Sequence, residues 1–294
     1  MQSISQVYMS KNIHLLVIDP QNDFCDLPSS YWPVNPLHAD QRIKPQLAVP
    51  GAHADMHRLA QFIRNGKHLI SNITITLDSH HHVGIERPTM WVKPDGTSPE
   101  PFTQLKAEDV RSGRVFPKSS TDKKRVLNYL DKLEAAGRYT HMIWPIHCEI
   151  GTWGHNIHAD VLAACNVWEV YAGKPTSKVI KGTNPYTEHY SALIAEVPDP
   201  DDPQTQLNSS LLASMQNSDV LLVAGEAGSH CVKSTLEHYL EYANEEYISR
   251  VVVLTDCMSP ITGFEQDYQE FLDKLESRGA TLTTAALWLS QNRE

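Results

Sequence analysis

Short runs of apolar residues alternate with amphipathic stretches along this chain of 294 residues. Runs with the length of buried strands predict strands at 13–18, 70–77, 141–144, 167–171, 220–224 and 251–254. Stretches with apolar residues three and four positions apart predict helices at 52–64, 121–136, 158–164, 209–216, 231–242 and 264–278. The alternation predicts an α/β fold, with a mostly parallel sheet covered by helices on both faces.

Two stretches interrupt this alternation, at residues 29–50 and 87–120. Both are rich in proline and polar residues, lack a clear period, and are longer than ordinary connections inside a domain. We therefore expect one domain spanning residues 1–294, with two insertions that form a lid or a contact between subunits.

Composition narrows the class of protein. The formal net charge is −10, whereas binding to nucleic acid needs clustered lysine and arginine, so we expect no nucleic-acid partner. The five cysteines are odd in number and contain no C-x-x-C pair, which is typical of reduced thiols in a cytoplasmic protein. The N-terminus lacks the pattern of a signal peptide, and no apolar run is long enough to span a membrane.

Cys231 lies where a predicted strand turns into a predicted helix. The apolar run 220–224 is followed by Gly225 and Gly228, and a helical pattern begins near His230. At a helix start, unpaired N–H groups and the helix dipole favour a thiolate, which is the form that acts as a nucleophile. Because an isolated cysteine is more often an inert core residue, this interpretation depends on what other residues lie nearby.

Other reactive side chains also follow apolar runs. Asp19 follows the first predicted strand, Asp78 the second and His147 the third. In parallel sheets the site lies beyond the carboxyl ends of the strands, so we expect these residues to meet Cys231 there. Asp19 could be a general base, a metal ligand or a cap, while Asp23 is the structural member of this pair.

A metal site is predicted around Asp78. Asp78 and His80 can converge on one ion, His147 is the natural third ligand, and Glu86 and His82 compete for the fourth position. Imidazole and carboxylate together suit a divalent metal such as zinc, with iron and manganese as alternatives. The competing interpretation is that the histidine run is a solvated loop.

Lys181 ends a short apolar run, after Val179 and Ile180. A partly buried lysine could stabilise a neighbouring thiolate, although a surface lysine beside a turn has the same local pattern. The chain contains no G-x-S-x-G, P-loop or G-x-G-x-x-G motif, so serine-hydrolase and nucleotide-binding functions lack their main support.

Together these segments resemble the isochorismatase-like cysteine hydrolases and, among them, the nicotinamidases. The resemblance covers about residues 12–259 and rests on VIDPQNDF, TLDSH, WPIHCEIGTWG, KGTN…YSAL and VAGEAGSHCV, in the family's order. It implies a three-layer α/β/α sandwich. It also implies a catalytic triad and a set of metal ligands, which are Asp19, Lys181 and Cys231, and Asp78, His80 and His147.

The same resemblance implies the surroundings of the nucleophile. It places a cis peptide between Glu226 and Ala227, and the N–H groups of Ala227 and Cys231 would form an oxyanion hole. The positions that match an aromatic substrate pocket are Phe24, Trp144, Tyr190 and His230. The chain departs from the family where Glu226 replaces an apolar residue, at Gly228-Ser229, and where Glu86 replaces a histidine ligand, so we expect Glu226 to alter the pocket's preference.

The resemblance implies deamidation of a small carboxamide, with nicotinamide as the first choice, in a homo-oligomer that binds a small-molecule substrate and a divalent metal. Three alternatives remain open. One is a metal-independent amidase or ureidohydrolase, and another is a vinyl-ether hydrolase of the isochorismatase type, which does not need Cys231. The third is a non-catalytic binding protein that retains the fold.

Overall fold

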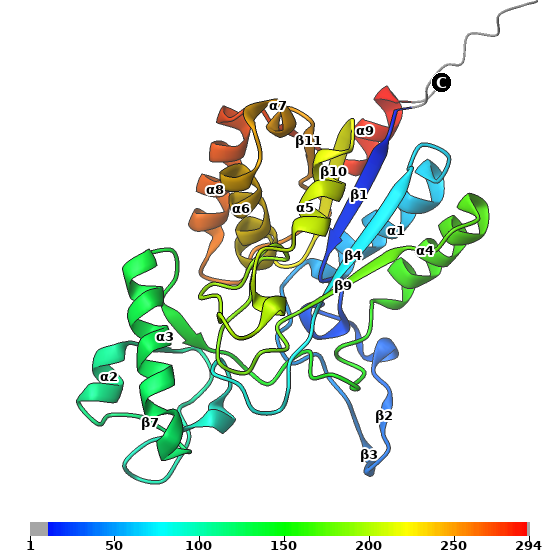
Figure 1. Cartoon of the computed structure of the whole chain (residues 1–294). Helices are drawn as coiled ribbons and strands as arrows, with labels where there is room; N and C mark the ends of the chain where they lie inside the picture. The colour runs from blue at the N-terminus through cyan, green and yellow to red at the C-terminus, as the bar shows by residue number, and fades with distance from the viewer. Residues whose placement is uncertain (1–10, 293–294) are drawn as a thin grey trace, which may run out of the picture.

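A six-stranded parallel sheet forms the centre of the molecule in the computed structural model, which describes residues 11–292 (Figure 1). The strands in spatial order are β12 (Thr281–Thr283), β11 (Val251–Leu254), β10 (Val220–Gly225), β1 (Ile13–Ile18), β4 (Asn72–Asp78) and β9 (Ser177–Lys181). All neighbouring pairs are parallel. The first ten residues, on which the expected absence of a signal peptide partly depends, lie outside the described residues.

Helices cover both faces of the sheet. One face carries α1 (Ala52–Gly66), α4 (Ala159–Ala172) and α9 (Ala285–Gln291), and the other carries α5 (Ser209–Gln216), α6 (Lys233–Tyr242), α7 (Glu245–Ile248) and α8 (Glu265–Ser277). Every residue of β1 is buried, as expected for a strand covered on both faces. The predicted three-layer α/β/α arrangement with a parallel sheet is confirmed.

A small unit beside the sheet departs from the prediction. The expected strand at 141–144 exists as β8 (His141–Ile143), but it pairs antiparallel with β6 (Thr103–Leu105) outside the main sheet. Around it lie β5 (Trp91–Val92), α2 (Ala107–Arg111), β7 (Phe116–Pro117) and α3 (Lys123–Ala136), with a core of their own. We call residues 91–143 the satellite unit; it contains most of the insertion predicted at 87–120 (Figure 1).

The other insertion, at residues 29–50, contains a hairpin. Its strands are β2 (Val34–Asn35) and β3 (His38–Arg42), which pair antiparallel and project from the body of the molecule (Figure 1). All residues of β3 are exposed, which explains why no apolar period marks this strand in the sequence. Short 3-10 turns connect other elements, at Asn22–Phe24, Ser29–Tyr31, Pro88–Met90, Ser120–Asp122 and Pro203–Thr205.

Some predicted elements are wrong. The strand expected at 167–171 is the second half of α4, a helix that is apolar on most sides, so its run of apolar residues has no helical period. Conversely, β9 was not predicted, because as an edge strand it exposes residues such as Ser177, Lys178 and Ile180. The terminal elements β12 and α9 were also missed.

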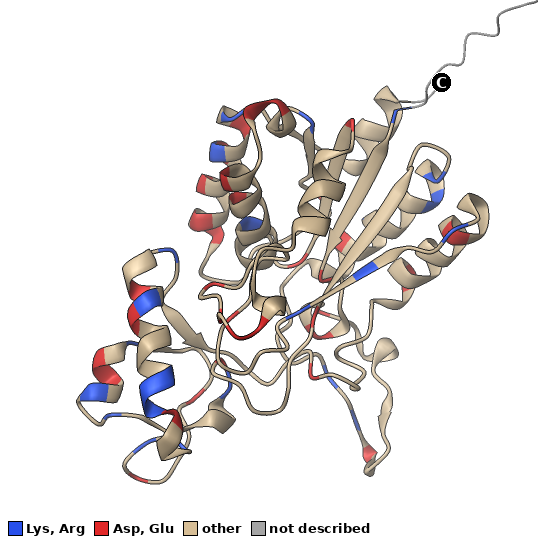
Figure 2. Ribbon diagram, in the orientation of Figure 1, with Lys and Arg blue, Asp and Glu red and all other residues tan. Residues whose placement is uncertain are grey.

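Charged residues lie mainly on the outer helices, and the cysteines form no disulfide among the described residues (Figure 2). Figure 2 shows acidic and basic positions mixed on the outer helices, with a row of acidic residues on α8. All five cysteines are free. Within residues 11–292, no helix has both the length and the apolar character needed to cross a membrane.

Candidate active site

The sheet brings the predicted catalytic residues together at its carboxyl edge. Asp19 follows β1, Asp78 ends β4 and Lys181 ends β9, and Asp78 is the register partner of Lys181. Cys231 lies in a π-helical turn, Gly228–Val232, that joins β10 to α6. Since β9, β4, β1 and β10 are consecutive in the sheet, all four side chains approach one point.

Lys181 is the centre of this group. Its Nζ lies 2.9 Å from Asp19 Oδ2, 2.9 Å from Asp78 Oδ1 and 3.5 Å from Cys231 Sγ. The side chain is 1% exposed. Burial alone would lower the pKa of Lys181, but the two carboxylates raise it well above its ordinary value, so the ammonium keeps its charge.

Asp19 is held by Thr76 of β4. Thr76 Oγ1 donates to Asp19 Oδ1 at 2.5 Å, and the Asp19 N–H donates to the same hydroxyl at 3.0 Å. Burial raises the pKa of Asp19, and Lys181 opposes this shift. A carboxylate that is oriented in this way and more basic than usual is suited to accept a proton.

Cys231 does not rest as a thiolate. Burial raises the pKa of its thiol well above the ordinary value; Lys181 lowers it, whereas Asp19 and Asp78 raise it further. The expected lowering of this pKa by the helix start is therefore outweighed. The thiol needs a base to become a nucleophile, and Asp19, which is in hydrogen-bond contact with the thiol, is the candidate.

The loop before Cys231 has the expected backbone. The peptide between Glu226 and Ala227 is cis. Gly225 has a φ of 124°, and a Cβ there would lie 1.9 Å from the carbonyl oxygen of Ile18, so only glycine fits. Ala227 borders the cavity at Cys231, and its N–H donates no hydrogen bond to any described residue. This N–H is available to an oxyanion.

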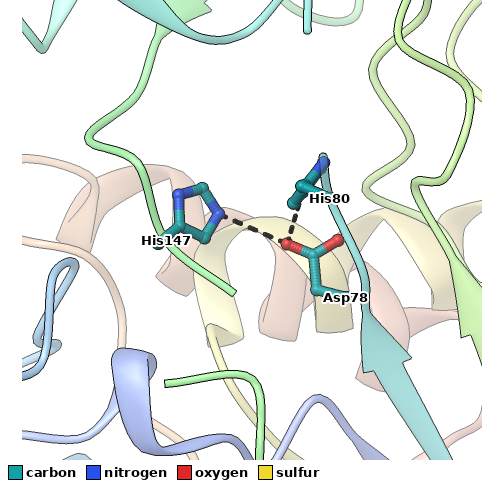
Figure 3. A group of neighbouring side chains, drawn as sticks. All are labelled: Asp78, His80 and His147. Atoms are coloured by element: carbon teal, nitrogen blue, oxygen red, sulfur yellow. Dashed lines mark hydrogen bonds and ion pairs between the residues drawn. The ribbon is translucent and has the colours of Figure 1, made fainter. Parts of the chain in front are cut away.

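The predicted metal ligands also meet, as Figure 3 shows. His80 Nε2 lies 2.8 Å and His147 Nε2 3.3 Å from Asp78 Oδ2. One nitrogen or oxygen from each of the three residues lies within 4.8 Å of the others, and all three side chains are buried. Two imidazole nitrogens and one carboxylate oxygen are a donor set that suits a zinc-like ion.

Glu86 and Arg87 surround these ligands. Glu86 Oε1 lies 3.1 Å from His80 Nδ1, so Glu86 contacts the ring from outside and leaves Nε2 facing Asp78. His147 Nδ1 lies 2.7 Å from the carbonyl oxygen of Pro145, and Arg87 donates to the same carbonyl. This matches the partners that orient metal-binding histidines. His82 is exposed and contacts Glu149 instead.

The charge states of the two histidines differ. Burial would lower the pKa of His80, but Asp78 and Glu86 raise it to about 9. Burial and Arg87 lower the pKa of His147 to about 4. In the absence of an ion a proton on His80 neutralises Asp78, and a divalent cation at this position would replace that proton.

A small cavity opens beside Cys231. Its walls include every aromatic position expected from the sequence, together with residues that sequence reasoning missed: Phe24, Trp144, Tyr190 and His230, and Leu47, Glu188 and Ile261. Trp144 Nε1 donates to the Tyr190 hydroxyl at 2.9 Å. The cavity encloses about 20 Å³, which is room for about one water molecule, so a ring-shaped ligand requires movement of these walls.

Glu188 is the main omission. It is buried in the cavity wall, and burial followed by the charge of Glu86 raises its pKa to about 7. It precedes YSAL in one of the motifs, but it lies in a loop rather than at a strand end, so the rule used for the other residues did not select it.

Glu226 does not line the cavity. Its Oε2 accepts from the Ser259 N–H at 3.2 Å, and its carboxyl group contacts Asp55 of α1. Burial, followed by the charge of Asp55, raises the pKa of Glu226 well above its ordinary value. The acidic group expected in the pocket thus lies behind the loop, where its surroundings favour the protonated form.

Asp23 has the structural role predicted for it. Its carboxylate accepts from the Cys148 N–H at 2.7 Å and from the Gln46 N–H at 3.0 Å. These bonds attach the segment after His147 and the end of the 29–50 insertion to the start of the chain.

No family model matches this chain, and no curated protein sequence does. Solved structures do match. A nicotinamidase/pyrazinamidase from Acinetobacter baumannii is 17% identical over 95% of this chain and 99% of its own, with a TM-score of 0.58. A yeast nicotinamidase bound to the inhibitor nicotinaldehyde is 18% identical over 92% and 99%, with a TM-score of 0.59.

A pyrazinamidase of Pyrococcus horikoshii in complex with zinc is 17% identical over 93% of this chain and 99% of its own, with a TM-score of 0.50. Proteins described as isochorismatase-like or isochorismatase family hydrolases match as well. This chain therefore has the isochorismatase-like fold, over nearly its whole length.

Proposed function

We propose that this protein is a cysteine-dependent amidohydrolase that converts a small carboxamide, most favourably nicotinamide, into a carboxylate and ammonia. The observation that supports the proposal is the position of the Lys181 ammonium, within 2.9 Å of Asp19 and 3.5 Å of Cys231 at the base of an aromatic cavity. The neighbours with this fold include nicotinamidases, which supports the choice of substrate.

In the first half-reaction, Asp19 accepts the thiol proton of Cys231, and Lys181 stabilises the thiolate. The sulfur attacks the amide carbon, a C–S bond forms, and the carbonyl electron pair moves to oxygen. The N–H groups of Ala227 and Cys231 donate to this oxyanion, a stabilisation of about 3 kcal/mol for each donor in known cases. As the C–N bond breaks, Asp19 returns the proton to nitrogen and ammonia leaves.

The second half-reaction hydrolyses the thioester. Asp19, again a carboxylate, accepts a proton from water while the water oxygen attacks the thioester carbon. The same two N–H groups stabilise the oxyanion. The C–S bond then breaks, the proton on Asp19 passes to the Cys231 sulfur, and the acid product loses the second proton of the water to solvent and leaves as a carboxylate.

Asp78, His80 and His147 would hold a divalent metal ion, for which zinc is the first choice and iron and manganese are alternatives. The zinc-bound pyrazinamidase with this fold supports that choice. When bound, the ion supplies a Lewis acid that can ligate the ring nitrogen of a pyridine carboxamide and so orient the amide toward Cys231. Glu86 orients His80, as its contact with Nδ1 indicates.

The decisive test is a screen for ammonia release from nicotinamide, pyrazinamide and small carbamoyl compounds. Replacing the nucleophile, Cys231→Ala, should reduce turnover at least about 10⁴-fold. The matched control is Cys257→Ala, which removes a buried cysteine outside the site and should leave turnover unchanged. Full activity of the Cys231→Ala protein would contradict the proposal.

The metal is tested separately. We expect a chelator, or His147→Ala, to reduce kcat/KM for nicotinamide at least about tenfold through misorientation of the ring. His82→Ala is the control, because this exposed neighbour lies outside the ligand set. Metal analysis of each purified variant accompanies the kinetics. Undiminished turnover of nicotinamide by metal-free protein would exclude the orienting role.

One observation favours a second candidate, a metal-independent amidase that acts on a small linear amide or carbamoyl compound. The cavity of about 20 Å³ accommodates a small polar group more readily than a pyridine ring. This candidate retains Asp19, Lys181 and Cys231. Turnover of linear amides but not nicotinamide, with no effect of chelator, would identify it.

Self-association belongs to the same proposal. The outward side of α4 exposes apolar side chains, among them Val167, Val170 and Tyr171, which a contact between two copies of the chain would cover. Light scattering of the purified protein measures the mass directly, and a monomer at micromolar concentration would contradict this part of the proposal.

A further inference from the structure

A second cavity lies directly behind one wall of the cavity at Cys231. The two cavities share Trp144, Tyr190 and His230, whose ring centroids are between 5.3 and 6.4 Å apart. We call these three rings the partition. The outer cavity encloses about 210 Å³, compared with about 20 Å³ for the inner one. Because the partition separates the two spaces, displacement of one of its rings would give a ligand at Cys231 access to the outer cavity.

The partition offers two hydrogen-bond donors. Trp144 Nε1 donates to the Tyr190 hydroxyl at 2.9 Å, and the hydrogen of that hydroxyl has no acceptor among the described residues. Ser229 Oγ accepts from the Ile261 N–H at 3.0 Å, and its own hydrogen has one acceptor within the described chain, His230 Nδ1 at 2.9 Å. His230 Nδ1 therefore accepts, and the hydrogen on its Nε2 is left for a ligand.

Lys233 adds a positive charge to the outer cavity. It is the first residue of α6, and it forms no ion pair with any residue in the described part of the chain. Its Nζ lies 5.4 Å from the centre of the Tyr139 ring, which stacks on the His230 ring at 6.1 Å. Burial, followed by the charge of Lys233, lowers the pKa of His230 to about 3. The ring is therefore a neutral donor close to an ammonium group.

Two other charged side chains line the outer cavity. Arg138 is already paired, with Glu237 at 3.4 Å and with Glu241 at 2.9 Å. Asp267 of α8 forms no ion pair with Lys233, although both line the same space. Lys233 is therefore the cation that a ligand can use, and Asp267 reduces the attraction of the cavity for an anion.

We propose that the outer cavity binds a carboxylate of the substrate, so that the preferred substrates are small amides with a second, negatively charged end. This inference rests on the proposed function and narrows its substrate class. The carboxamide would reach Cys231, and the connecting atoms would pass the displaced partition. The carboxylate would pair with Lys233 and accept from His230 Nε2 and the Tyr190 hydroxyl, since its two oxygens can accept several hydrogen bonds. Nicotinamide has no such group and would leave the outer cavity unused.

The test compares the monoamides of succinate, glutarate and adipate with amides of the same chain length that end in a methyl group. Ammonia release gives kcat/KM for each compound, and the ratio within a pair measures recognition of the carboxylate. We expect at least one acid-ended amide to be favoured about tenfold or more, the usual contribution of a hydrogen bond to a charged group. Lys233→Met should remove this preference, mainly through KM.

Two further variants locate the effect. Asp267→Asn should raise the ratio about two- to fivefold, because it removes a negative charge from the same cavity. Lys124→Met is the matched control, since it removes an exposed cation of α3 that lines neither cavity, and its ratio should equal that of the unaltered chain.

A binding measurement keeps this inference separate from the proposed function. Calorimetry with the three monoamides on Cys231→Ala does not depend on turnover, and adding Lys233→Met should weaken binding of the preferred one at least about tenfold. This result supports the outer site even if the unaltered chain releases no ammonia. A general preference for methyl-ended amides would overturn the inference and leave the proposed function intact. Equal affinities of Cys231→Ala and Cys231→Ala/Lys233→Met, with circular dichroism showing both folded, would also overturn it.

Discussion

Two pairs of buried carboxyl groups flank the loop that carries Cys231, and they are neutralised in different ways. On one side Lys181 lies between Asp19 and Asp78. On the other side Glu226 meets Asp55, which pairs with Arg58 of the same helix, while Glu226 itself forms no ion pair with any described residue. Burial alone would raise the pKa of Asp78, but His80 and Lys181 hold it well below its usual range, whereas the pKa of Glu226 is well above it.

Asp78 and Glu226 are equally buried, but two cationic neighbours lower the pKa of Asp78, whereas the nearest charge at Glu226 is a second carboxyl group that raises its pKa. The pair around Lys181 places carboxyl groups next to the thiol, where the proposed mechanism needs a proton acceptor. Behind the loop, burial raises the pKa of both Glu226 and Asp55, Asp55 also pairs with Arg58, and both carboxyl groups accept hydrogen bonds from Ser259.

Removing the Lys181 ammonium should cause the largest loss in the free energy of unfolding. Lys181→Met leaves two buried carboxylates without their partner, and loss of one member of a buried ion pair costs about 3–5 kcal/mol. Urea denaturation at pH 7 measures this loss in the free energy of unfolding. Lys178→Met, at an exposed position of the same strand, is the control and should have little effect. A loss below about 1 kcal/mol for Lys181→Met would contradict the assigned role.

Loss of the proton from Glu226 at higher pH should reduce the free energy of unfolding by a smaller amount. The pKa of Glu226 is raised in the folded state, so its contribution to stability is complete below about pH 4.3 and is lost as the pH rises toward the folded value. Glu226→Gln keeps an amide at this position and does not titrate. Relative to the unaltered chain, we expect this variant to gain at least about 1.4 kcal/mol between pH 5 and pH 8.

Thermal or urea unfolding at the two pH values gives this difference directly. Glu270→Gln, on the exposed side of α8, is the matched control and should shift both values equally. A constant difference between the Glu226→Gln variant and the unaltered chain across this range would show that Glu226 is ionised in the folded state.

The smallest effect concerns the orientation of Asp19. Thr76→Val keeps the shape of the side chain but removes the hydroxyl that donates to Asp19 Oδ1 and accepts from its N–H. A buried donor left without a partner costs about 1–3 kcal/mol, and we expect the rate of ammonia release to fall about tenfold. Stability and kcat are measured on the same preparation. An unchanged kcat would mean that Lys181 alone orients Asp19.

Most of the group around Lys181 could be predicted from the sequence, because position at a strand end is a local signal. Asp19, Asp78 and Cys231 each follow an apolar run, and the parallel sheet brings them together. Lys181 was ambiguous locally, since β9 is an exposed edge strand, and the family resemblance selected it. Its burial depends on neighbours that are distant in sequence.

The contact between Glu226 and Asp55 could not be predicted, because the two residues are far apart in the sequence and Asp55 belongs to no motif. The sequence suggested that Glu226 would face the substrate, whereas the loop turns its side chain toward α1. The direction of the pKa shift at Cys231 was also not anticipated. Local position gives the helix-start effect, but burial and two carboxylates depend on the folded environment.

Because β8 pairs with β6 and not with the central sheet, the site is built from two parts of the molecule, the central sheet and the satellite unit. Cys231 and the three charged residues beside it, Asp19, Asp78 and Lys181, follow or end strands of the central sheet. Trp144 and His147 instead follow β8 of the satellite unit. Arg87, just before this unit, holds the backbone of both Pro145 and His147. Under the proposed function, substitutions that shift the satellite unit would change the pocket wall at Trp144 and His147 and leave the residues around Cys231 in place.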